Sequence, residues 1–390
     1  MTPGARVQAA IEVLDLVIHA ARNNGAPADR IIADWFRARR FAGSGDRRAV
    51  RELVYAAIRA CGKLPASGRA AMLALADKDA ALAALFDGQG HAPAPIAVDE
   101  PRAKRGVAQT WLMKMLAGSD IDGAEATALL ARAPLDVRIN QLKGDAPELP
   151  LTGEATKAPH ALRFPAGTPV EQWAAYDAGA IEVQDSGSQL ACEAVQAQPG
   201  ESIIDLCAGA GGKTLALAAT MDNRGKLIAC DTDRGRLSRL APRAERAGAT
   251  IIATELLNPG KEAAALIAWR DTADAVLIDA PCSGTGTWRR NPEGRWRITE
   301  REIARLSVLQ ARLLDLGATL VRPGGRLAYV VCSLLDVEGP DQLAAFLARH
   351  PQWRADALSL PAGSPRGAGI RLTPHHDATD GFFIARLIRL

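Results

Sequence analysis

The pattern of hydrophobic and polar positions changes at about residue 130. Before it, apolar residues recur three or four positions apart, as Val7, Ile11, Leu14 and Ile18 do, with charged residues on the other faces. A second such stripe lies within 50–58, and no strand-like alternation interrupts the pattern. The first 130 residues are therefore predicted to form a small helical bundle. A segment rich in Gly, Pro and charge near 87–105 is predicted to be a linker or a long surface loop.

Beyond residue 130 the chain first contains short predicted strands broken by Pro and Gly, and after residue 181 strands alternate with helices. Strands are expected at 202–205, 226–231, 250–254, 275–279, 325–331 and 381–385, and helices near 233–247, 261–269 and 299–321. Such alternation predicts an α/β fold with a doubly wound, mostly parallel sheet. We therefore expect a helical domain (1–130), a small α+β subdomain (131–180) and an α/β domain (181–390).

Composition narrows the class of protein. Hydrophobic residues make up 48% and charged residues 23% of the 390, as in ordinary globular proteins. A net charge of +3 excludes a strongly basic nucleic-acid coat, so a site for a polyanion requires local clustering. No apolar run approaches the roughly 18 residues of a membrane span, and the first apolar stretch is interrupted by acidic residues, unlike a signal peptide. The 6 cysteines are scattered without a CxxC pair, so we expect reduced thiols, a cytoplasmic protein and no bound metal.

A glycine-rich turn, Asp205–Thr214, follows the first strand of the α/β domain. A phosphate-binding loop would need glycine at Cys207, and a dinucleotide fingerprint would need glycine at Thr214. The pattern therefore favours a nucleoside ligand held by the turn and by Asp231 at the end of the next strand, which could bond ribose hydroxyls. Two structural alternatives stay open: a turn that only packs tightly, and Asp231 as a helix N-cap.

Two cysteines follow the ends of later strands. Asp279 and Cys282 come directly after the fourth strand, and Cys332 follows the fifth. Because ligands of doubly wound sheets bind outside the carboxyl ends of the strands, we expect these residues to meet at one rim with the glycine turn. A thiolate that adds to carbon 6 of a pyrimidine makes carbon 5 able to attack a methyl donor. Lys213 is a candidate cation that would favour the thiolate; a solvated lysine at a helix start is the alternative.

Taken together, these segments resemble one known family. The matching segments are 205–214, 279–290 and Cys332-Ser333, with 133–140, 183–190 and 380–383 besides. They resemble the RsmB/Fmu (Nop/Sun) family of S-adenosylmethionine-dependent RNA cytosine-5 methyltransferases over roughly 130–390. The resemblance implies a Rossmann-like class I methyltransferase sheet, mostly parallel with one antiparallel strand, after a small α+β subdomain. More weakly, and best at 46–54, the first domain resembles the NusB-type RNA-binding domain of the bacterial 16S rRNA members.

The resemblance also implies roles for single residues. Cys332 would be the nucleophile, Cys282 would assist release of the enzyme, and Asp279 would contact the target base beside Lys213. S-adenosylmethionine, converted to S-adenosylhomocysteine, would be bound by Cys207, Ala208, Gly209, Ala210, Gly211, Gly212, Lys213, Asp231, Glu255 and Asp279. Asn258 is the alternative to Glu255.

The sequence departs from the family pattern in the donor turn and before the nucleophile. Gly209-Ala210 stands where the family usually has Ala-Pro, which loosens the turn, and Val331 stands where Thr is usual. Neither change removes a proposed catalytic group. The predicted function is methylation of carbon 5 of a cytosine in RNA, with 16S rRNA the preferred substrate and a monomer the preferred state. A tRNA methyltransferase and a non-catalytic RNA-binding factor of ribosome assembly are the alternatives.

Two arginine clusters are candidates for contacts with RNA phosphates, and tryptophans in the first are candidates for stacking on unpaired bases. The first cluster contains Trp288, Arg289, Arg290, Arg295, Trp296, Arg297, Arg301 and Arg305, and the second Arg37, Arg39, Arg40, Arg47, Arg48 and Arg51. Each cluster could instead be a solvated face. The target cytosine would have to leave its stack to reach a thiolate, which favours a single-stranded segment.

Overall fold

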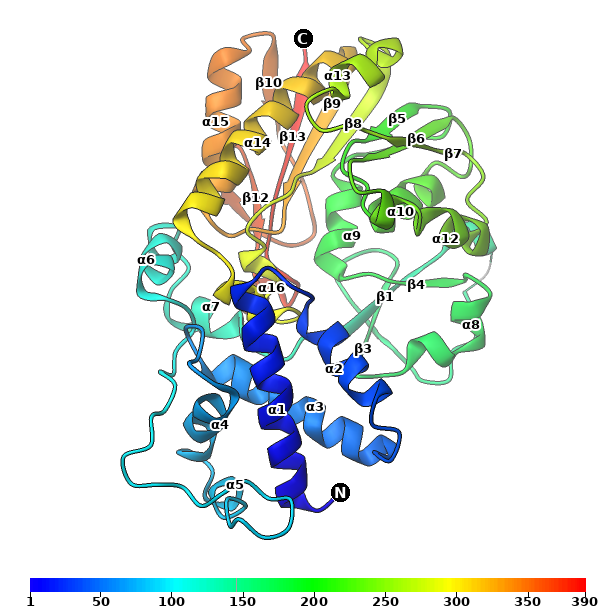
Figure 1. The fold of residues 1–390 in the computed structure, drawn as a ribbon. Helices are drawn as coiled ribbons and strands as arrows, with labels where there is room; N and C mark the ends of the chain where they lie inside the picture. The colour runs from blue at the N-terminus through cyan, green and yellow to red at the C-terminus, as the bar shows by residue number, and fades with distance from the viewer. Residues whose placement is uncertain (145) are drawn as a thin grey trace. The chain divides into compact units, whose positions relative to one another are not determined.

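The apolar stripes of the first 130 residues form the core of a helical unit (Figure 1). A computed structural model describes residues 1–144 and 146–390 and divides the chain into two units. The helical unit contains 1–131 and 287–299, and the sheet unit contains 132–286 and 300–390. The predicted boundary near 130 therefore lies close to a structural one, but the segment 287–299 packs with the helices.

The helical unit is built around its first helix. Its elements are α1 (Pro3–Arg22), α2 (Ala28–Arg37), α3 (Ser44–Ala60), α4 (Gly68–Ala76), α5 (Ala80–Ala83), α6 (Thr110–Gly118), α7 (Gly123–Ala128) and the 3₁₀ turn η5 (Pro292–Trp296). Thr2 caps α1 by accepting from the Ala5 amide, and Pro3 stands in the first turn, where a missing N–H costs nothing. At Gly68 a Cβ would lie 2.2 Å from the Ile11 carbonyl oxygen, so glycine lets α4 approach α1.

The expected surface loop near 87–105 is held against the helices. Residues 84–109 contain no helix or strand, although Arg105 makes an isolated β-bridge with Cys61. Arg69 pairs with Glu100, and Arg102 pairs with Asp77 at 2.8 Å. These ion pairs add to the packing of Ile96 and Ala103 against the helical core, and together they hold the segment.

The arginine and tryptophan cluster after the cysteine loop is buried in part, whereas its members Arg301 and Arg305 are exposed. Trp288 and Trp296 are 1% and 5% exposed, and Arg295 is fully buried. The Arg295 guanidinium donates to the carbonyl oxygens of Ile58 (2.6 Å) and Cys61 (2.9 Å) at the end of α3. The expectation that these tryptophans stack on RNA bases is therefore wrong, because carbonyl groups at a helix end need donors and this segment supplies them.

The sheet unit begins with a small antiparallel sheet in the order β2-β3-β1-β4. Its elements are β1 (Leu135–Ile139), η1 (Gln141–Lys143), β2 (Glu154–Ala155), β3 (Ala161–Phe164), η2 (Val170–Gln172), α8 (Ala174–Asp177) and β4 (Ile181–Val183). Val137, Phe164 and Ile181 form its core, where the Phe164 and Trp173 rings meet edge to face at 5.1 Å.

The large sheet has the strand order β11-β12-β13-β9-β8-β5-β6-β7, and β10 also pairs with β13. Its strands are β5 (Ser202–Asp205), β6 (Lys226–Asp231), β7 (Ile252–Leu256), β8 (Ala273–Asp279), β9 (Val321–Val331), β10 (Trp353–Asp356), β11 (Ser364–Arg366), β12 (Gly369–Leu372) and β13 (Phe382–Arg389). The pairings among β5, β6, β7, β8 and β9 are parallel, which confirms the predicted α/β class. A single antiparallel strand was expected, but β10, β11 and β12 extend the sheet beyond β13 through further antiparallel pairings.

Helices cover both faces of this sheet. They are α9 (Ser186–Glu193), α10 (Gly212–Thr220), α11 (Arg234–Leu237), α12 (Leu240–Ala247), α13 (Glu262–Ala265), α14 (Glu300–Leu320), α15 (Pro340–Arg349) and α16 (Pro374–Asp377), with short turns η3 (Ile267–Trp269), η4 (Thr285–Thr287) and η6 (Asp336–Glu338). The helix expected at 233–247 is thus divided into α11 and α12.

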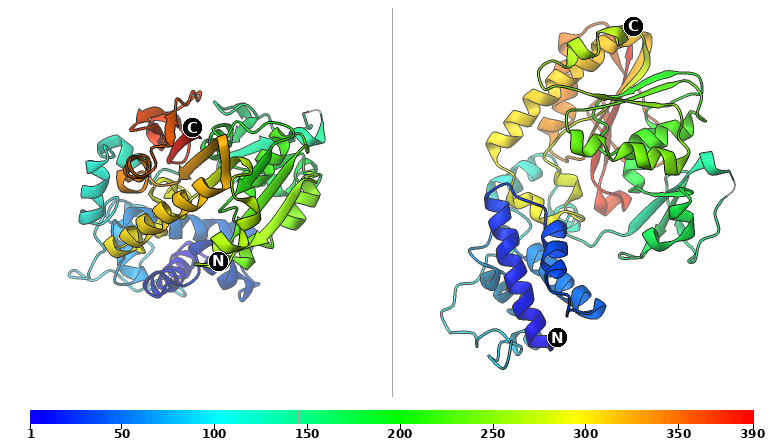
Figure 2. Two further views of the ribbon diagram at one scale, coloured as in Figure 1. Left: turned by 90° about the horizontal axis from the view of Figure 1, so that it is seen from above. Right: turned by 45° about the vertical axis from the view of Figure 1, so that its right-hand side comes forward.

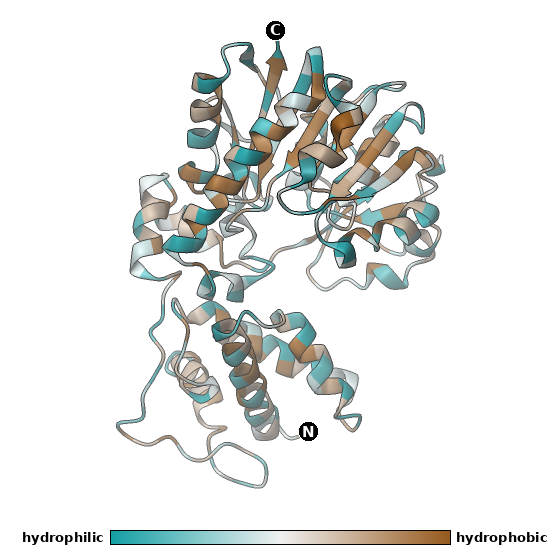
Figure 3. Cartoon of the chain, turned by 45° about the horizontal axis from the view of Figure 1, so that its top comes forward, coloured by the Kyte–Doolittle hydropathy of each residue, from teal (hydrophilic) through white to brown (hydrophobic). Residues whose placement is uncertain are grey.

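The side chains of adjacent residues in each strand point to opposite faces of the sheet. Ile203 packs in the core that contains α9, α10 and α12, whereas Ile204 packs in the core with α14 and α15. Figure 2 shows α14 running along one face of the sheet, and Figure 3 shows hydrophobic strands inside more polar helices. Both faces of the central strands β5 and β8 are buried, so their apolar runs are nearly continuous, as is usual for parallel sheets. Across residues 1–144 and 146–390, no helix is long and apolar enough to cross a membrane.

Candidate active site

Four neighbouring strands place their carboxyl ends at one rim of the sheet. Asp205 ends β5, Asp231 ends β6, Asp279 ends β8, and Cys332 directly follows β9. Asp279 lies in register with Val330, so the cysteines that follow β8 and β9 emerge side by side. The structure therefore brings together the glycine turn and both cysteine segments, as the parallel topology predicted.

The glycine turn is held by backbone bonds at its start. The Ala208 amide donates to the Cys230 carbonyl oxygen (2.8 Å), and the Gly211 amide donates to the Ala208 carbonyl oxygen (2.9 Å). Gly209 and Gly211 adopt φ of 57° and 84°, a region that favours glycine. A Cβ on Gly211 would also lie 2.1 Å from Leu240 Cδ1, so both the backbone angle and the lack of space require glycine at this position.

Asp231 reaches into the turn. One carboxylate oxygen accepts from the Gly209 amide (2.7 Å), and the other accepts from the Asp233 amide (2.7 Å). The helix that follows is capped by Asp233, whose side chain accepts from the Arg236 amide, so the N-cap alternative for Asp231 is wrong. Each carboxylate oxygen can accept a further bond, so these contacts leave Asp231 able to accept from a ligand hydroxyl.

Lys213 and Asp279 form an ion pair beneath the rim. Lys213 Nζ donates to Asp279 Oδ2 at 2.7 Å, with the two side chains 11% and 32% exposed. Burial alone would lower the pKa of Lys213, but the neighbouring Asp279 carboxylate outweighs it and the pKa is raised. Lys213 Nζ also lies 5.6 Å from the centre of the Phe382 ring. The alternative of a solvated lysine is therefore wrong, and this ammonium stays charged.

The two sulfurs face each other. Cys282 Sγ and Cys332 Sγ are 3.4 Å apart, and both side chains are partly buried free thiols. The hydrogen bond to Cys332 and burial raise the pKa of Cys282 well above its ordinary value. Cys282 therefore keeps its proton, which it can donate to the sulfur of Cys332.

A buried carboxylate that the sequence analysis missed holds the two cysteine segments together. Glu338, fully buried in η6, accepts from the amide of Ser283 (2.9 Å), the hydroxyl of Ser333 (2.6 Å) and the Ser283 hydroxyl. Gln310 of α14 donates to the same carboxylate at 3.0 Å. Ser283 and Ser333 each directly follow one of the cysteines, so Glu338 sets the spacing of the sulfurs. An acidic residue six positions after Cys332 was the available signal, but no local pattern marks it.

Asp205 is a second buried carboxylate with a strongly shifted pKa. One of its oxygens accepts from the Thr214 hydroxyl (2.7 Å), and the other has no partner among the described residues. Burial raises the pKa of Asp205 to about 7, and the Asp279 and Asp231 carboxylates contribute in the same direction. The strand end therefore holds a carboxyl group that titrates near neutral pH.

Two predicted donor contacts lie apart from the rest. Cys207 packs against the core on the α14 side of the sheet, and burial raises the pKa of its thiol well above the ordinary value. Glu255 is exposed and lies in register with Cys230 rather than with Asp231, so it belongs to the opposite face of the sheet from Asp231. Asn258 follows the end of β7 and is also exposed. A donor contact by either residue stays a prediction.

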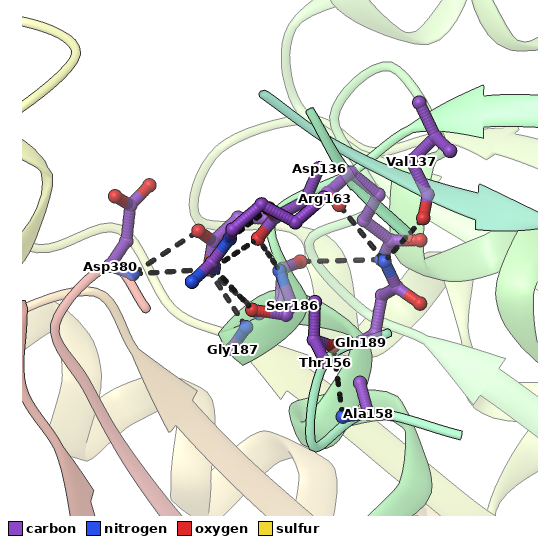
Figure 4. A network of polar contacts seen from close by, with 12 residues as sticks. Asp136, Val137, Thr156, Ala158, Arg163, Ser186, Gly187, Gln189 and Asp380 are labelled. Atoms are coloured by element: carbon purple, nitrogen blue, oxygen red, sulfur yellow. Dashed lines mark hydrogen bonds and ion pairs between the residues drawn. The ribbon is translucent and has the colours of Figure 1, made fainter. Parts of the chain in front are cut away.

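The three outlying segments of the family pattern meet in one polar network (Figure 4). Arg163 binds both oxygens of Asp136, at 2.7 and 2.8 Å, and Asp136 also accepts from the Ser186 amide (3.0 Å). Burial alone would raise the pKa of Asp136, but these donors lower it. Asp185 caps α9 and accepts from the Asp380 amide (3.2 Å). The network thus connects the small sheet, α9 and the start of β13.

The network continues by backbone contacts to Cys332. The Gly381 amide donates to the Gly286 carbonyl oxygen (2.8 Å), and the Gly286 amide donates to the Cys332 carbonyl oxygen (3.0 Å). A Cβ on Gly286 would lie 2.1 Å from the Gly381 carbonyl oxygen, so the two backbones touch. Segments that carry no reacting group therefore position Cys332.

The turn fits a nucleoside ligand that carries a carboxylate. Among the described residues, no side chain caps α10, so its first amides are free to bind an anion. A Cβ on Gly212 would meet nothing within 4 Å, which shows open space at the start of the helix. Asp231 supplies an acceptor on the other side of the turn. Within residues 1–144 and 146–390, no group of His, Cys, Asp and Glu is arranged to hold a metal ion.

Comparison with known proteins adds a family. The family model described as 16S rRNA methyltransferase RsmB/F matches residues 192–388. The probable ribosomal RNA small subunit methyltransferase B of Synechocystis sp. is 36% identical over 298 residues, which are 71% of this chain and 66% of that protein. The chain thus spans slightly less than two thirds of the length of this curated relative.

Solved structures share the fold. PH0851 superposes with a TM-score of 0.77 at 26% identity and covers 99% of both chains. NSun6 from Pyrococcus horikoshii, solved with SFG, reaches a TM-score of 0.60 at 19% identity over 72% of this chain and 97% of that one. The second similarity concerns the fold alone.

Proposed function

Because the chain belongs to the RsmB/F methyltransferase family, we propose that it methylates carbon 5 of a cytosine in RNA, with 16S rRNA as the substrate and S-adenosylmethionine as the methyl donor. The observation that carries the proposal is the pair of sulfurs 3.4 Å apart at the rim where Lys213 and Asp279 form their ion pair. A methyltransferase that only bound its base and donor would need one sulfur at most. Two facing sulfurs suit covalent activation followed by release.

The donor side of the site is the glycine turn. The amides at the start of α10 and the Asp231 carboxylate are the groups that would hold S-adenosylmethionine, and the left-handed glycines keep its path free of side chains. When bound, the donor supplies a methyl group on a positively charged sulfur. Asp279 stands between this turn and the cysteines, so its carboxylate is available to both ligands.

Cys332 is the proposed nucleophile. Its thiolate adds to carbon 6 of the cytosine, and the electron pair of the 5,6 double bond moves toward carbon 5 and the N3 edge of the base. Asp279 accepts a hydrogen bond from the N4 amino group of the cytosine, and the Lys213 ammonium beside it offsets the negative charge that develops at the N3 edge. The Lys213 ammonium, held by Asp279, adds a positive charge near the Cys332 sulfur and favours its ionised form.

Cys282 is proposed to complete the reaction. After carbon 5 has taken the methyl group it still carries a proton, which must leave before the product is released. Cys282 first gives its own proton to water; its thiolate then accepts the carbon-5 proton while the 5,6 double bond re-forms and Cys332 leaves carbon 6 as a thiolate. The raised pKa of Cys282 makes its thiolate a strong base for this step.

The RNA substrate is proposed from the relatives. The curated relative from Synechocystis sp. is named for ribosomal RNA of the small subunit, and the NusB-like interpretation of the helical unit offers an RNA-binding role. Within that unit Arg40 and Arg48 are exposed, so the second arginine cluster remains a candidate for phosphate contacts. A transfer RNA substrate and a non-catalytic assembly role become outcomes of the test.

The test is methyl transfer from labelled S-adenosylmethionine to unmodified 16S rRNA, with unmodified tRNA assayed in parallel. Wild-type protein is expected to label one cytosine of 16S rRNA. The Cys332→Ala variant should lose activity at least a thousandfold, and Cys282→Ala should accumulate a covalent protein–RNA complex that survives denaturing electrophoresis. The Cys61→Ala variant, whose sulfur lies in the helical unit, is the matched control and should keep activity.

Each failure has a distinct meaning. Full activity of Cys332→Ala would show that another group is the nucleophile. Labelling of tRNA alone would show that tRNA, and not 16S rRNA, is the substrate. Binding of 16S rRNA without donor binding or methylation would favour the assembly-factor alternative. An active Cys282→Ala variant without an adduct would overturn the division of roles between the sulfurs.

A further inference from the structure

A side chain outside the family pattern braces the donor turn. Arg243 of α12 donates to the Ala210 carbonyl oxygen at 2.6 Å. Ala210 lies between the two left-handed residues Gly209 and Gly211, where the backbone is freest to rotate. The peptide that joins Ala210 to Gly211 is thereby held at both ends, since its N–H donates to the Ala208 carbonyl oxygen at 2.9 Å.

Arg243 is itself held in place by a buried carboxylate. Glu182 of β4 is 2% exposed and accepts from Arg243 at 2.9 Å through one oxygen and from Arg246 through the other. Glu182 lies in register with Arg138 on β1, whose guanidinium is buried. The carboxylate is thus placed by the small sheet, and its charge is balanced by arginines on two elements. A buried, paired carboxylate of this kind gives Arg243 little freedom to leave Ala210.

The second arginine on Glu182 does not reach the turn. Arg246 stacks on the Tyr176 ring at 4.1 Å and pairs with Glu182, whereas the bond to Ala210 comes from Arg243. Both side chains are similarly exposed, at 27% for Arg243 and 20% for Arg246. The two residues therefore share their carboxylate partner and helix, but Arg243 bonds the donor turn whereas Arg246 stacks on Tyr176. That difference makes Arg246 a matched control for Arg243.

The sequence of the turn makes its conformation depend on the bond from Arg243. Gly209-Ala210 replaces the Ala-Pro pair of the family pattern, so no proline ring restricts the backbone here. If the peptide between Ala210 and Gly211 rotated, the N–H of Gly211 would leave Ala208 and the start of α10 would lose its alignment. A donor that binds those amides would then have to order the turn first, which lowers its affinity.

We propose that Arg243, clamped by Glu182, is a positioning residue that holds the donor turn in its binding conformation and so sets the affinity for S-adenosylmethionine. The inference rests on the proposed function for the identity of the donor. It joins the small antiparallel sheet to donor binding through a chain of three contacts: β1 to β4, Glu182 to Arg243, and Arg243 to Ala210. In this proposal the small sheet supports donor binding through Glu182 and Arg243.

The experiment compares the full-length Arg243→Ala, Arg243→Lys and Arg246→Ala variants with the wild type. Calorimetric titration with S-adenosylmethionine and with S-adenosylhomocysteine gives Kd, and hydrogen exchange of the unliganded proteins reports the mobility of 206–214. Arg243→Ala should raise both Kd values about tenfold, a typical coupling between two sites, and should speed exchange in the turn. Arg243→Lys keeps a charged donor and should recover part of the affinity, while Arg246→Ala should stay within about twofold of the wild type.

The outcomes separate the inference from the proposed function. A wild-type Kd in a folded Arg243→Ala protein, or an equal loss in Arg246→Ala, would overturn the positioning role. If Arg243→Ala does not fold, Arg243→Lys carries the test: unchanged Kd and unchanged exchange in the turn overturn the inference. A wild-type protein that binds neither compound would overturn the proposed function first, and the inference with it.

Discussion

At the scale of single residues, two carboxyl groups are buried near the rim of the sheet. Asp205 ends β5 with one oxygen bonded to Thr214, and Glu338 receives donors from both cysteine segments. The two differ in what they stabilise. Glu338 has a full set of donors and holds the site together, whereas Asp205 has an oxygen without a partner among the described residues and a raised pKa.

Asp205 makes the stability of the protein depend on pH. In the folded state its pKa is about 7, against 3.8 for an ordinary aspartate, so between these values the folded protein binds more protons than the unfolded chain. Its contribution to stability is present below pH 4 and is lost as the pH rises through 7. We expect the free energy of unfolding of Asp205→Asn, taken relative to that of the wild type, to rise between pH 5 and pH 8 by on the order of a few kcal/mol. Thermal unfolding at both pH values checks this, and an equal difference at both would contradict it.

Glu338→Gln tests the link between the cysteine segments. The amide group of glutamine would face donors from Ser283 and Ser333, leaving at least one buried polar group unpaired, at a cost of about 1–3 kcal/mol. We expect kcat to fall at least tenfold while the Kd for the donor is unchanged, because the sulfurs lose their spacing and the donor turn is untouched. Steady-state kinetics and calorimetry give the two numbers. Glu302→Gln, which removes an exposed pair with Arg305, is the control.

At the scale of elements, local pattern predicted most strands and missed how they are joined. The strand ends at Asp205, Asp231 and Asp279 were anticipated because apolar runs stop there and glycine or proline follows. The strands β10, β11 and β12 were missed because they are only three or four residues long; β11 and β12 form a short hairpin, and β10 pairs with the distant β13. The division of the helix at 233–247 was also missed, since the arginine-rich pattern continues through it.

The close contact between Gly286 and Gly381 leads to a prediction about how two segments of the sheet unit pack together. Adding a methyl group at Gly286 places Cβ 2.1 Å from the Gly381 carbonyl oxygen, so the segment before β13 or the segment of Cys332 must move. Gly286→Ala should cost about 1–3 kcal/mol of stability, as overpacking does, and should reduce methyl transfer more than donor binding. Gly45→Ala, in α3 with nothing within 4 Å of the added Cβ, should be neutral. Thermal unfolding of both variants measures the loss of stability, and donor titration measures any change in Kd.

At the scale of the whole molecule, the chain leaves the sheet unit and returns to it. Segment 287–299 begins five residues after Cys282 and contributes Trp296 to the helical core. Arg295 supplies donors to the last carbonyls of α3, and burial lowers its pKa to about 10. The helical unit is therefore made from two distant parts of the sequence, and one of them continues directly from the segment of Cys282.

This organisation predicts the result of truncation. A chain that starts at residue 132 keeps 287–299 but loses the helices that bury Trp288, Trp296 and Arg295. We expect such a chain to aggregate or to expose this segment to proteolysis, while the full-length protein resists cleavage there. Limited proteolysis followed by mass spectrometry would show it. A soluble, protease-resistant 132–390 fragment with wild-type donor affinity would contradict the expectation.

The sequence by itself predicted most of the elements and the candidate residues that meet at the rim of the sheet. Periodicity, glycines at turns and cysteines after apolar runs are local properties, and the parallel topology then requires strand ends to share a rim. Tertiary structure alone decided which charged and aromatic side chains are buried. Trp296 and Arg295 look like a surface cluster in sequence but complete a helical core, and Glu338 and Arg243 acquire their roles from partners dozens of residues away. Burial and pairing depend on contacts between distant segments, and no local pattern encodes those.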